Sequence, residues 1–542
     1  MPQQFAEPIP GSNLSVFRQL VATTERFIEH LDGVQFHSLY TVVPLLTQLL
    51  GLENPLFGSG KSPFSAISLL PRIKDPNVFQ WQLDLSLAER RVLLDEIYDM
   101  IAPILLGEQE AYIDLLIDTV YVNEFRGNQT CASEFRAVQR EKFDVISPLV
   151  HRLKVVDPRN FAQIAHYGYY SDLKREHGFL KQLPDELVEA WCSRSFPTVF
   201  ELNFRGFNGD AGAVRGWIVV INNSTEQLLN NHKLRKAKIL QCARLAEKLG
   251  AQIVGMAGLI AFFGKGGYFL SEQFPHVGFT TGHAYTIANI LEIAKASTKR
   301  AGLSLTEATV AIVGAAGSIG SGCAKLFAQL GVPRLILIDI LWQEQLETVV
   351  AAVRAINQQI QVTASPRLQA MRAADLSVVA TNSPRTIIDP DFLKPGAIVI
   401  DDSFPKNVPE TITKARDDII AVEGGMARLP STMEIDRARN VPNVMDVPLT
   451  RMISCQEVYG CFVETITLAA CGHRGNYGLG PSNPLLAQDI LVKARELGIS
   501  PAPLQFFGQA VSEKRFRHAA QVRRQMEMNG FVTTERSDYG KS

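Results

Sequence analysis

The chain of 542 residues carries a formal net charge of −1, with 46% hydrophobic and 20% charged residues, a composition typical of an ordinary globular protein. This near-neutral charge gives no electrostatic reason to expect nucleic acid as a partner, and no apolar run reaches the length of about 18 residues that predicts a membrane span. The N-terminus lacks the basic start and apolar core of a secretory signal, and the seven cysteines lack the paired spacing of disulfides or metal ligands, so we expect a cytoplasmic protein with free thiols and no metal.

Apolar periodicity and composition predict four domains. Residues 1–192 are expected to be mainly helical, because apolar stripes such as Phe17–Ile28 recur there at helical spacing. Residues 193–300 are expected to form a mixed α/β substrate domain, residues 301–450 a Rossmann-type parallel sheet domain, and residues 451–542 a C-terminal helical segment packed on the substrate domain. The expected fold class is therefore α/β.

The substrate domain begins with a predicted β-hairpin, because apolar and polar residues alternate on both sides of a Gly/Asn/Asp turn between Phe196 and Asn223. A helix over Thr225–Leu249 is expected next. The following run, Val254–Phe269, is rich in small residues that allow close approach of the backbone to a ligand or a neighbouring helix. It fits the wall of an apolar tunnel and plain helix packing equally well. A further helix is expected to start near Thr281.

Residues Thr309–Asp339 have the pattern strand, glycine turn, helix, strand, which opens a dinucleotide-binding fold. The first glycine lets the chain turn as it leaves the strand, the second leaves room for the pyrophosphate, and the third lets the helix pack on the sheet. The spacing is G-x-x-G-x-x-G, and the alternative is an ordinary strand–turn–helix that binds nothing. The residues expected to hold the phosphates at this helix N-terminus are Gly314, Ala316, Gly317, Ser318, Ile319 and Gly320.

Asp339 ends the second strand about 20 residues beyond the last glycine, where an acid bonds the ribose 2′-hydroxyl of NAD. A carboxylate at this position repels the 2′-phosphate of NADP, and Ile340 rather than Arg follows it. The local chemistry therefore favours NADH over NADPH, unless a basic residue from elsewhere in the chain reverses this preference.

Two later apolar stretches, Asp375–Pro384 and Ala397–Pro405, are predicted to be further parallel strands. Thr381 and Asn382 lie in the later part of the first stretch, where a strand end would face the nicotinamide half of a bound dinucleotide. The pair Asp401–Asp402 ends the second strand. Such an adjacent acidic pair is more typical of a turn or cap than of a catalytic dyad.

The stretch Ile453–Gly480 holds three of the seven cysteines, and its middle is predicted to be a helix that includes Val458. Cys461 shares a face of this helix with Glu464 and Leu468. Without other context, a free cysteine in an apolar helix is most often a buried and inert thiol. Cys323 and Cys471 are assigned to this class.

Five stretches of the chain keep the order and spacing of a known enzyme family, and together they span about residues 196–503. They resemble the long-chain acyl-(acyl-carrier-protein) reductases of the cyanobacterial type. The matching stretches are Phe279–Thr286, Thr309–Ser321, Val399–Asn407, Glu423–Gly425 and Cys461–Gly480. Within the last stretch, the family pattern is matched at Cys461, Phe462, Glu464, Leu468, Gly472, Asn476 and Gly480.

The resemblance implies an NAD(P)H-dependent reductase that converts a fatty acyl thioester, carried by acyl carrier protein or coenzyme A, to a fatty aldehyde. Cys461 would hold the acyl group as a thioester before hydride transfer. His283, Tyr285 and Lys406 lie in family-like stretches and are the candidate donors for the oxyanion. Glu464 would hinder thiolate formation if it faced Cys461 directly, and otherwise orients the helix. An aldehyde-consuming enzyme is a further partner that the product chemistry suggests.

Two features depart from the family. Its members generally use NADPH and have Arg after the second strand, where this chain has Asp339 and Ile340. The N-terminal region of residues 1–192 has no counterpart in the family. The sequence therefore leaves open the cofactor, the acyl chain length, the acyl carrier and the oligomeric state.

Other interpretations of the sequence also remain. The basic stretch Lys514–Arg524 fits a solvated helix face better than a docking site for an acidic carrier protein. A dehydrogenase of a small hydroxy or amino acid, with no covalent intermediate, is the first alternative function. A non-enzymatic nucleotide-binding scaffold is the second.

Overall fold

The computed structural model describes residues 157–168, 197–209, 212–340, 343–436 and 456–528, together with residues 174, 181, 188–189 and 192–193. The chain separates into two compact units, one of Met1–Lys154 and His177–Pro197 and the other of Val155–Glu176 and Thr198–Ser542. Almost all described residues belong to the second unit. The expected helical domain, residues 1–192, lies largely outside the described residues.

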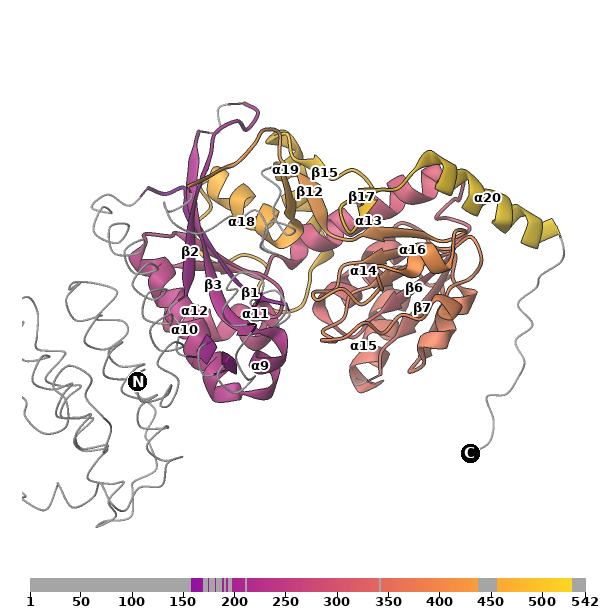
Figure 1. The fold of residues 1–542 in the computed structure, drawn as a ribbon, viewed down its shortest axis with the longest axis horizontal. Coiled ribbons are helices and arrows are strands. Elements are labelled where there is room, and N and C mark those ends of the chain that lie inside the picture. The colour runs from indigo at the N-terminus through magenta and orange to yellow at the C-terminus, as the bar shows by residue number, and fades with distance from the viewer. Residues whose placement is uncertain are drawn as a thin grey trace, which may run out of the picture. The chain divides into compact units, whose positions relative to one another are not determined.

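The first sheet has six strands in the order β13-β2-β3-β1-β4-β5 (Figure 1). Its strands β2 and β3 pair antiparallel, which confirms the predicted hairpin, whereas β1 pairs parallel with both β3 and β4. The bounds are β1 Asn160–Tyr167, β2 Thr198–Phe204, β3 Val214–Ser224, β4 Ile253–Met256, β5 Gly278–Thr280 and β13 Glu434–Asp436.

Strand β1 lies inside the range 1–192 that the sequence predicts to be mainly helical, and it is a strand that the sequence does not predict. All eight of its residues are buried, because the strand lies in the interior of the sheet and is covered on both faces. Such a strand does not alternate between apolar and polar residues. The sequence of β1 therefore lacks the signal by which a half-exposed strand is recognised.

The second sheet has six strands in the order β11-β10-β9-β6-β7-β8, and all its neighbours pair parallel. Numbered from β6 as the first strand, this is the order 3-2-1-4-5-6 of a Rossmann fold, so the predicted α/β class is confirmed. The bounds are β6 Thr309–Val313, β7 Arg334–Ile338, β8 Gln361–Ser365, β9 Leu376–Val379, β10 Ile398–Asp401 and β11 Ile420–Glu423.

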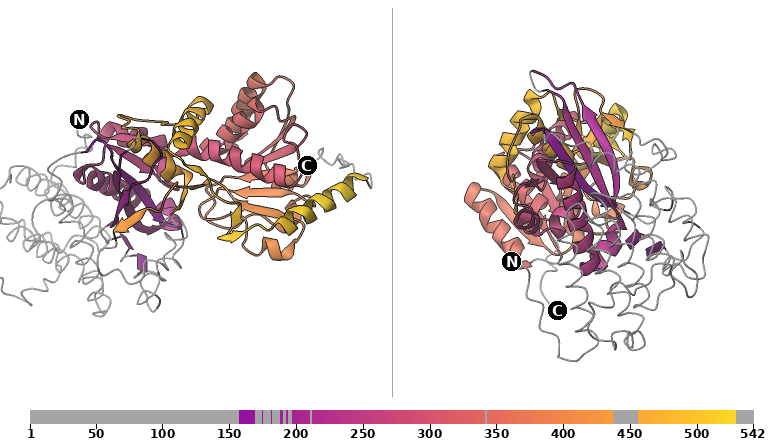
Figure 2. Two further views of the ribbon diagram at one scale, coloured as in Figure 1. Left: turned by 90° about the horizontal axis from the view of Figure 1, so that it is seen from above. Right: turned by 90° about the vertical axis from the view of Figure 1, so that its left-hand side faces the viewer.

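Helices cover both faces of this parallel sheet (Figure 2). Along β6, Val310 and Ile312 point into the apolar core on one face, and Ala311 and Val313 into the core on the other, because successive side chains of a strand alternate between faces. Among the described residues of the second unit, the α-helices are α9 Thr225–Asn230, α10 His232–Lys248, α11 Ile260–Phe263, α12 Tyr268–Gln273, α13 His283–Arg300, α14 Ser318–Gln329, α15 Gln343–Ile356, α16 Ile412–Ala415, α18 Gly460–Ala470, α19 Pro484–Glu496 and α20 Glu513–Met528.

Helix α13 connects the two sheets. It follows β5 of the first sheet, leads to β6 of the second, and packs against α14, α18 and α19. A third, small sheet pairs β12 (Met426–Arg428) with β14 (Glu457–Tyr459) and β15 (Ser500–Pro501). No helix in the described part of the chain is both long and apolar enough to cross a membrane.

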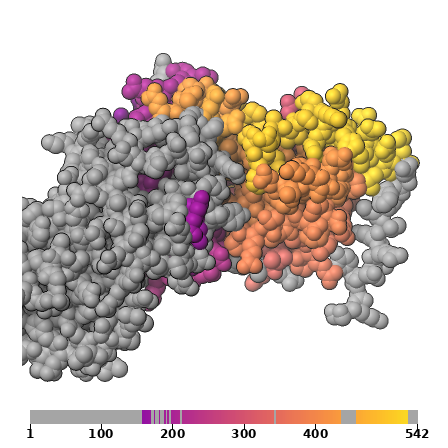
Figure 3. Space-filling model, in the orientation of Figure 1, coloured from indigo at the N-terminus to yellow at the C-terminus, as the bar shows by residue number. Residues whose placement is uncertain are grey.

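Helix α20 lies on the surface of the subdomain that is built on the second, parallel sheet (Figure 3). Part of the basic stretch Lys514–Arg524 nevertheless faces inward. The Arg515 guanidinium donates to main-chain carbonyls that include Ile419 O at 2.9 Å. Arg523, which is buried, donates to Gly396 O at 3.0 Å. These two arginines fasten α20 to the subdomain, so they are not part of a free basic surface.

The loop after β10 is held by Asp401, whose side chain is fully buried. Its carboxylate accepts the N–H groups of Ser403 at 2.9 Å, Asn407 at 2.9 Å and Val408 at 2.8 Å. For Asp401, the interpretation of the acidic pair as a cap is therefore confirmed.

We expect Asp401→Ala to lower the free energy of unfolding by about 3 kcal/mol or more, because it leaves three buried N–H groups without an acceptor. Thermal melting followed by intrinsic fluorescence should show a fall of several degrees. Asp417→Ala is the control, since the Asp417 side chain is 83% exposed and its ion pair with His518, at 3.5 Å, lies on the surface, where such contacts are worth little. Equal melting temperatures for the two variants would contradict this role of Asp401.

Candidate active site

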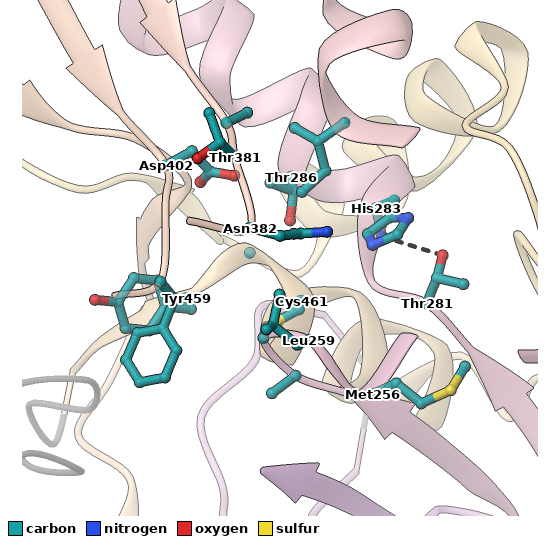
Figure 4. A pocket seen from close by; sticks show the side chains of 16 residues that line it. Met256, Leu259, Thr281, His283, Thr286, Thr381, Asn382, Asp402, Tyr459 and Cys461 are labelled. Atoms are coloured by element: carbon teal, nitrogen blue, oxygen red, sulfur yellow. Dashed lines mark hydrogen bonds between the residues drawn. The ribbon is translucent and has the colours of Figure 1, made fainter. Parts of the chain in front are cut away.

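A pocket lies at the carboxyl edge of the parallel sheet, beside the point where the strand order reverses between β6 and β9 (Figure 4). Residues Met256–Leu259 after β4 and Ala380–Asn382 after β9 line it, and Tyr459–Cys461 at the start of α18 close it. His283 and Asp402 also face this space. In open α/β sheets, ligands bind at this edge and at this switch point.

Cys461 is the second residue of α18 and is partly exposed to the pocket. The helix begins after Tyr459 without a side-chain cap, so its first N–H groups and its dipole favour negative charge near the thiol. Backbone hydrogen bonding from Phe462 and Gly258 lowers the pKa of the thiol. These contacts would stabilise a thiolate.

Other features of the site oppose ionisation of Cys461. Burial raises the pKa of its thiol to about 12, and the nearby charges of Asp402 and Glu464 act in the same direction, against the two backbone hydrogen bonds. The resting site therefore holds a protonated thiol at neutral pH. Any reaction through sulfur requires a group that accepts its proton.

Helices α13 and α18 meet at Gly282, immediately before His283. Gly282 has φ +74°, and an added Cβ would lie 2.4 Å from both the Cα and the Cβ of Cys461. Only glycine allows this approach, because any larger residue would be strained by φ and would collide with the thiol-bearing residue. The close contact fixes Cys461 against the start of α13.

Glu464 lies about one turn from the start of α18, and its side chain caps the N-terminus of the neighbouring helix α13. Its buried carboxylate accepts the hydroxyl of Thr280 and the N–H of Tyr285, the latter at 2.7 Å. Backbone N–H groups of Gly282 and Ala284 also reach it. Burial raises the pKa of Glu464 to about 7 against these hydrogen bonds. The carboxylate thus orients the two helices, which is one of the two roles that the sequence allows.

His283 begins α13 and faces the pocket. Burial lowers the pKa of its imidazole to about 4, so the ring is neutral at physiological pH. Its Nδ1 lies 2.9 Å from Ser318 Oγ, which in turn lies 2.9 Å from Ser482 Oγ. Because Ser318 is the first residue of α14, this contact joins the thiol side of the pocket to the glycine loop.

The other two candidate oxyanion donors do not line the pocket. Tyr285 is fully buried, and its hydroxyl has no hydrogen-bond partner among the described residues. Lys406 donates from Nζ to Asp401 O at 2.8 Å and lies over the ring of Tyr459. Burial alone would lower the pKa of Lys406, but Tyr459 and the surrounding carboxylates raise it overall.

The glycine loop has the conformation that the sequence predicts. Gly314 has φ +82°, and an added Cβ would lie 2.2 Å from Ala380 O. Gly320 packs directly on Gly314, whose carbonyl oxygen would lie 2.1 Å from a Cβ at position 320. Gly317, in contrast, is exposed, and an added Cβ would meet only Gly314 O, at 3.2 Å.

These features fit a dinucleotide. Helix α14 starts at Gly317 with no side-chain cap, so the first N–H groups, those of residues such as Ser318 and Ile319, are available to a phosphate. The space above Gly317 is open on the same side. A phosphate could therefore approach the backbone here without displacing a side chain.

Asp339 follows β7, and its carboxylate accepts the N–H of Ala316 at 3.1 Å. It thus holds the glycine loop from the neighbouring strand, at the position where a ribose is expected. Thr381 and Asn382 follow β9 and line the pocket. The Thr381 side chain hydrogen-bonds to Asn407, which fixes this strand end to the loop held by Asp401.

Two details of the cysteine-rich stretch differ from expectation. Val458 lies in β14, not in the helix, because β14 pairs with β12 up to Tyr459 and α18 starts only at Gly460. Cys471 is exposed, since it forms the C-cap where α18 ends. Cys323 is buried, as expected.

Several residues of the pocket carry little signal in the sequence. Met256–Leu259 belongs to the small-residue run that fits a tunnel wall and helix packing equally well, and in the structure it is the pocket wall beside Cys461. The sequence marks Asp402 only as half of an acidic pair. Phe404 carries no signal, because it approaches the pocket only through the fold of the loop after β10.

Comparison with known proteins finds relatives at low identity. The chain is 26% identical over 270 residues to the aminotransferase PigE of Serratia sp., a match that covers 49% of this chain and spans 30% of that protein. It is 27% identical over 318 residues to the long-chain acyl-[acyl-carrier-protein] reductase of Synechococcus elongatus, covering 57% of this chain and 87% of that protein. No protein-family model matches the chain.

Solved structures give weaker likenesses. The NAD-dependent malic enzyme of Thermotoga maritima aligns over 74% of this chain and 91% of that chain, at 13% identity and a TM-score of 0.31. The malic enzyme of Pyrococcus horikoshii covers 72% and 87%, at 15% identity and a TM-score of 0.27. These proteins are enzymes, but the scores are too low to align their sites with this one. The Rossmann-type fold is established by the strand order.

The buried carboxyl of Glu464 predicts a pH dependence of stability. Its pKa of about 7 in the folded chain exceeds the unfolded value of about 4.3, so the folded state binds more protons between these values. The stabilisation from this group is fully present below about pH 4.3 and is lost as the pH rises to the folded pKa of about 7, by about 4 kcal/mol in total. Urea unfolding from pH 5 to 8 should show wild type losing stability relative to Glu464→Gln. If the stability of wild type relative to Glu464→Gln stayed constant or rose with pH, the raised pKa of Glu464 would be wrong.

Proposed function

We propose that the protein is an NAD(P)H-dependent reductase that converts a fatty acyl thioester to a fatty aldehyde through a thioester on Cys461. One observation carries the proposal: Cys461 lines the same pocket as Thr381 and Asn382, at the switch point of the parallel sheet. Similarity to the long-chain acyl-[acyl-carrier-protein] reductase over most of that protein's length supports the substrate class. The acyl donor would be a thioester of acyl carrier protein or of coenzyme A.

The first step is thioester exchange. The Cys461 sulfur attacks the acyl carbon, the bond from that carbon to the carrier sulfur breaks, and the acyl group is left on Cys461. Asp402 is the proposed acceptor of the thiol proton, directly or through a water, and passes it to the departing carrier thiolate. Burial raises the pKa of Asp402 to about 7, which suits a group that must take up and release a proton near neutral pH.

The second step releases the aldehyde. The bound dinucleotide supplies the hydride that reduces the acyl carbon. Donors around Cys461 must then stabilise the oxyanion, and the Gly258 N–H and the neutral imidazole of His283 are the groups that line this part of the pocket. When the oxyanion collapses, the carbon–sulfur bond breaks, and Cys461 leaves as a thiolate that takes a proton from solvent.

The cofactor would be held by the glycine loop and by Asp339. The uncapped start of α14 would bind the pyrophosphate, and the carboxylate of Asp339 would accept the ribose hydroxyls. The charge of Asp339 favours NADH, whereas the family resemblance favours NADPH. We give more weight to the charge of Asp339, because it would act on the 2′ oxygen of the ribose, the position at which NADH and NADPH differ.

Cys461→Ser is expected to lower kcat for aldehyde formation by about 1,000-fold or more, because a serine hydroxyl is a far weaker nucleophile without a base matched to it. Wild type incubated with an acyl thioester and no NAD(P)H should gain the mass of one acyl group, and the variant should not. Cys471→Ser, which alters an exposed thiol outside the pocket, should retain both properties.

The same assay separates the alternatives. If Cys461→Ser keeps its turnover, the protein is a dehydrogenase that works without a covalent intermediate. Steady aldehyde production by wild type excludes the non-enzymatic scaffold.

For the cofactor, we expect wild type to show a higher kcat/KM with NADH than with NADPH. Asp339→Asn keeps an oxygen for the Ala316 N–H but removes the charge, so it should shift the ratio towards NADPH by about tenfold, or ~1.4 kcal/mol. Initial rates with NADH and with NADPH give the ratio of the two kcat/KM values, and a melting curve shows whether the substitution destabilises the protein. A wild-type preference for NADPH would refute the role given to Asp339.

A further inference from the structure

His166 lies behind the wall of the pocket, near the end of β1, and is 2% exposed. Its Nδ1 bonds to Tyr167 O at 2.9 Å, and its Nε2 accepts the N–H of Leu259 at 3.1 Å. A carbonyl can only accept and an N–H can only donate, so the proton must be on Nδ1 and the ring must be neutral. Burial, which lowers the pKa of His166 to about 4, agrees with this state.

The turn held by His166 contains Gly258, whose φ is +56°. An added Cβ at Gly258 would lie 2.8 Å from His166 Nε2 and 3.4 Å from the Phe404 ring. The Phe404 ring meets the His166 ring edge-on, with centroids 5.7 Å apart. The turn is therefore packed closely against two rings, and its conformation depends on the acceptor at Nε2.

Gly258 has a direct connection to the thiol. Backbone hydrogen bonding from Gly258 is one of the two influences that lower the pKa of the Cys461 thiol, and both residues line the pocket. An acyl oxygen on that sulfur would lie within reach of the same N–H, since it is only two bonds from the sulfur. The orientation of this one N–H thus affects both the thiolate and the oxyanion.

We infer that His166 is a positioning residue: by accepting the Leu259 N–H, it holds Gly258 in the turn that directs the Gly258 N–H at Cys461. The oxyanion part of this inference rests on the proposed reductase function, whereas the effect on the thiol does not. His166 does not line the pocket and is neutral, so it acts through Gly258 and not as an acid or base.

Two substitutions separate the two ring nitrogens. His166→Gln sets an oxygen near the position of Nε2 and can still accept the Leu259 N–H, while His166→Asn offers only a donor near the position of Nδ1. The rate of Cys461 alkylation by iodoacetamide at pH 8, followed by peptide mass spectrometry without any acyl donor, reports on the thiol. We expect His166→Asn to slow alkylation about tenfold, and we expect the alkylation rate of His166→Gln to stay within about twofold of wild type.

The direction of the change distinguishes positioning from a merely structural role. If His166 only filled space, its loss would loosen the wall and expose the thiol, and alkylation would become faster. Alkylation that is unchanged or faster in His166→Asn would overturn the inference. Because this assay contains no acyl thioester, its outcome is independent of whether the protein is a reductase.

Steady-state kinetics then test the oxyanion part. With an acyl thioester that wild type reduces, His166→Asn should lower kcat about 100-fold with KM changed less than about threefold, and His166→Gln should restore most of the rate. Equal kcat values for the two variants would overturn this part. If instead Cys461→Ser reduces the acyl thioester as fast as wild type, the reductase proposal is refuted. The alkylation result would not be affected.

A second pair of variants covers the case in which His166 cannot be changed without unfolding. Leu259 has φ −80°, which proline adopts readily, so Leu259→Pro removes the N–H that His166 accepts and leaves His166 in place. Leu259 lines the pocket, so Leu259→Ala, which loses most of the same side chain but keeps the N–H, is the reference for Leu259→Pro. Alkylation should be slower in Leu259→Pro than in Leu259→Ala, and equal rates in the two variants would overturn the inference.

Discussion

The buried carboxylate of Glu464 is the contact on which the geometry of the site depends. It lies within α18, yet it accepts hydrogen bonds from Thr280 at the end of β5 and from Tyr285 in the first turn of α13. Helix α13 packs on α14, which begins at the glycine loop. The location of the thiol relative to the cofactor loop is therefore set by one carboxylate and by the close approach of Gly282 to Cys461, not by the loops that line the pocket.

The same arrangement explains why the thiol is protonated at rest. Burial and two carboxylates raise the pKa of Cys461, while two backbone N–H groups lower it. Electrostatic interactions are stronger where water is excluded, because the dielectric constant is low. The pKa of Cys461 is therefore sensitive to a change in any one of these groups. Protonation of Asp402, whose own pKa is raised to about 7, removes a like charge from the site. In the proposed mechanism, proton transfer from Cys461 to Asp402 would therefore remove one negative charge from the site as it creates another on the sulfur.

The sequence is sufficient for features that local chemistry dictates. The glycine turn, its two flanking strands and the helix α14 follow from residues within one short segment, and the hairpin of β2 and β3 follows from alternation beside a turn. Strand β1 is not predictable in this way because it is buried on both faces, and neither is the place of His166 within it. The site also joins distant segments, as in the hydrogen bond from Thr465 to Gln163 across 302 residues. Motif membership likewise cannot show that Tyr285 turns away from the pocket.

Under the proposed function, Asp339 would couple cofactor choice to the geometry of the glycine loop. Its carboxylate accepts the Ala316 N–H and so helps to hold the turn, and its charge lies where the 2′ position of a ribose is expected. An arginine here would attract a 2′-phosphate, but it has no acceptor to offer and would leave the Ala316 N–H without this partner. A chain with arginine at this position must therefore hold its glycine loop by other contacts. Cofactor preference in this fold is consequently a property of the whole turn and not of one exchangeable side chain.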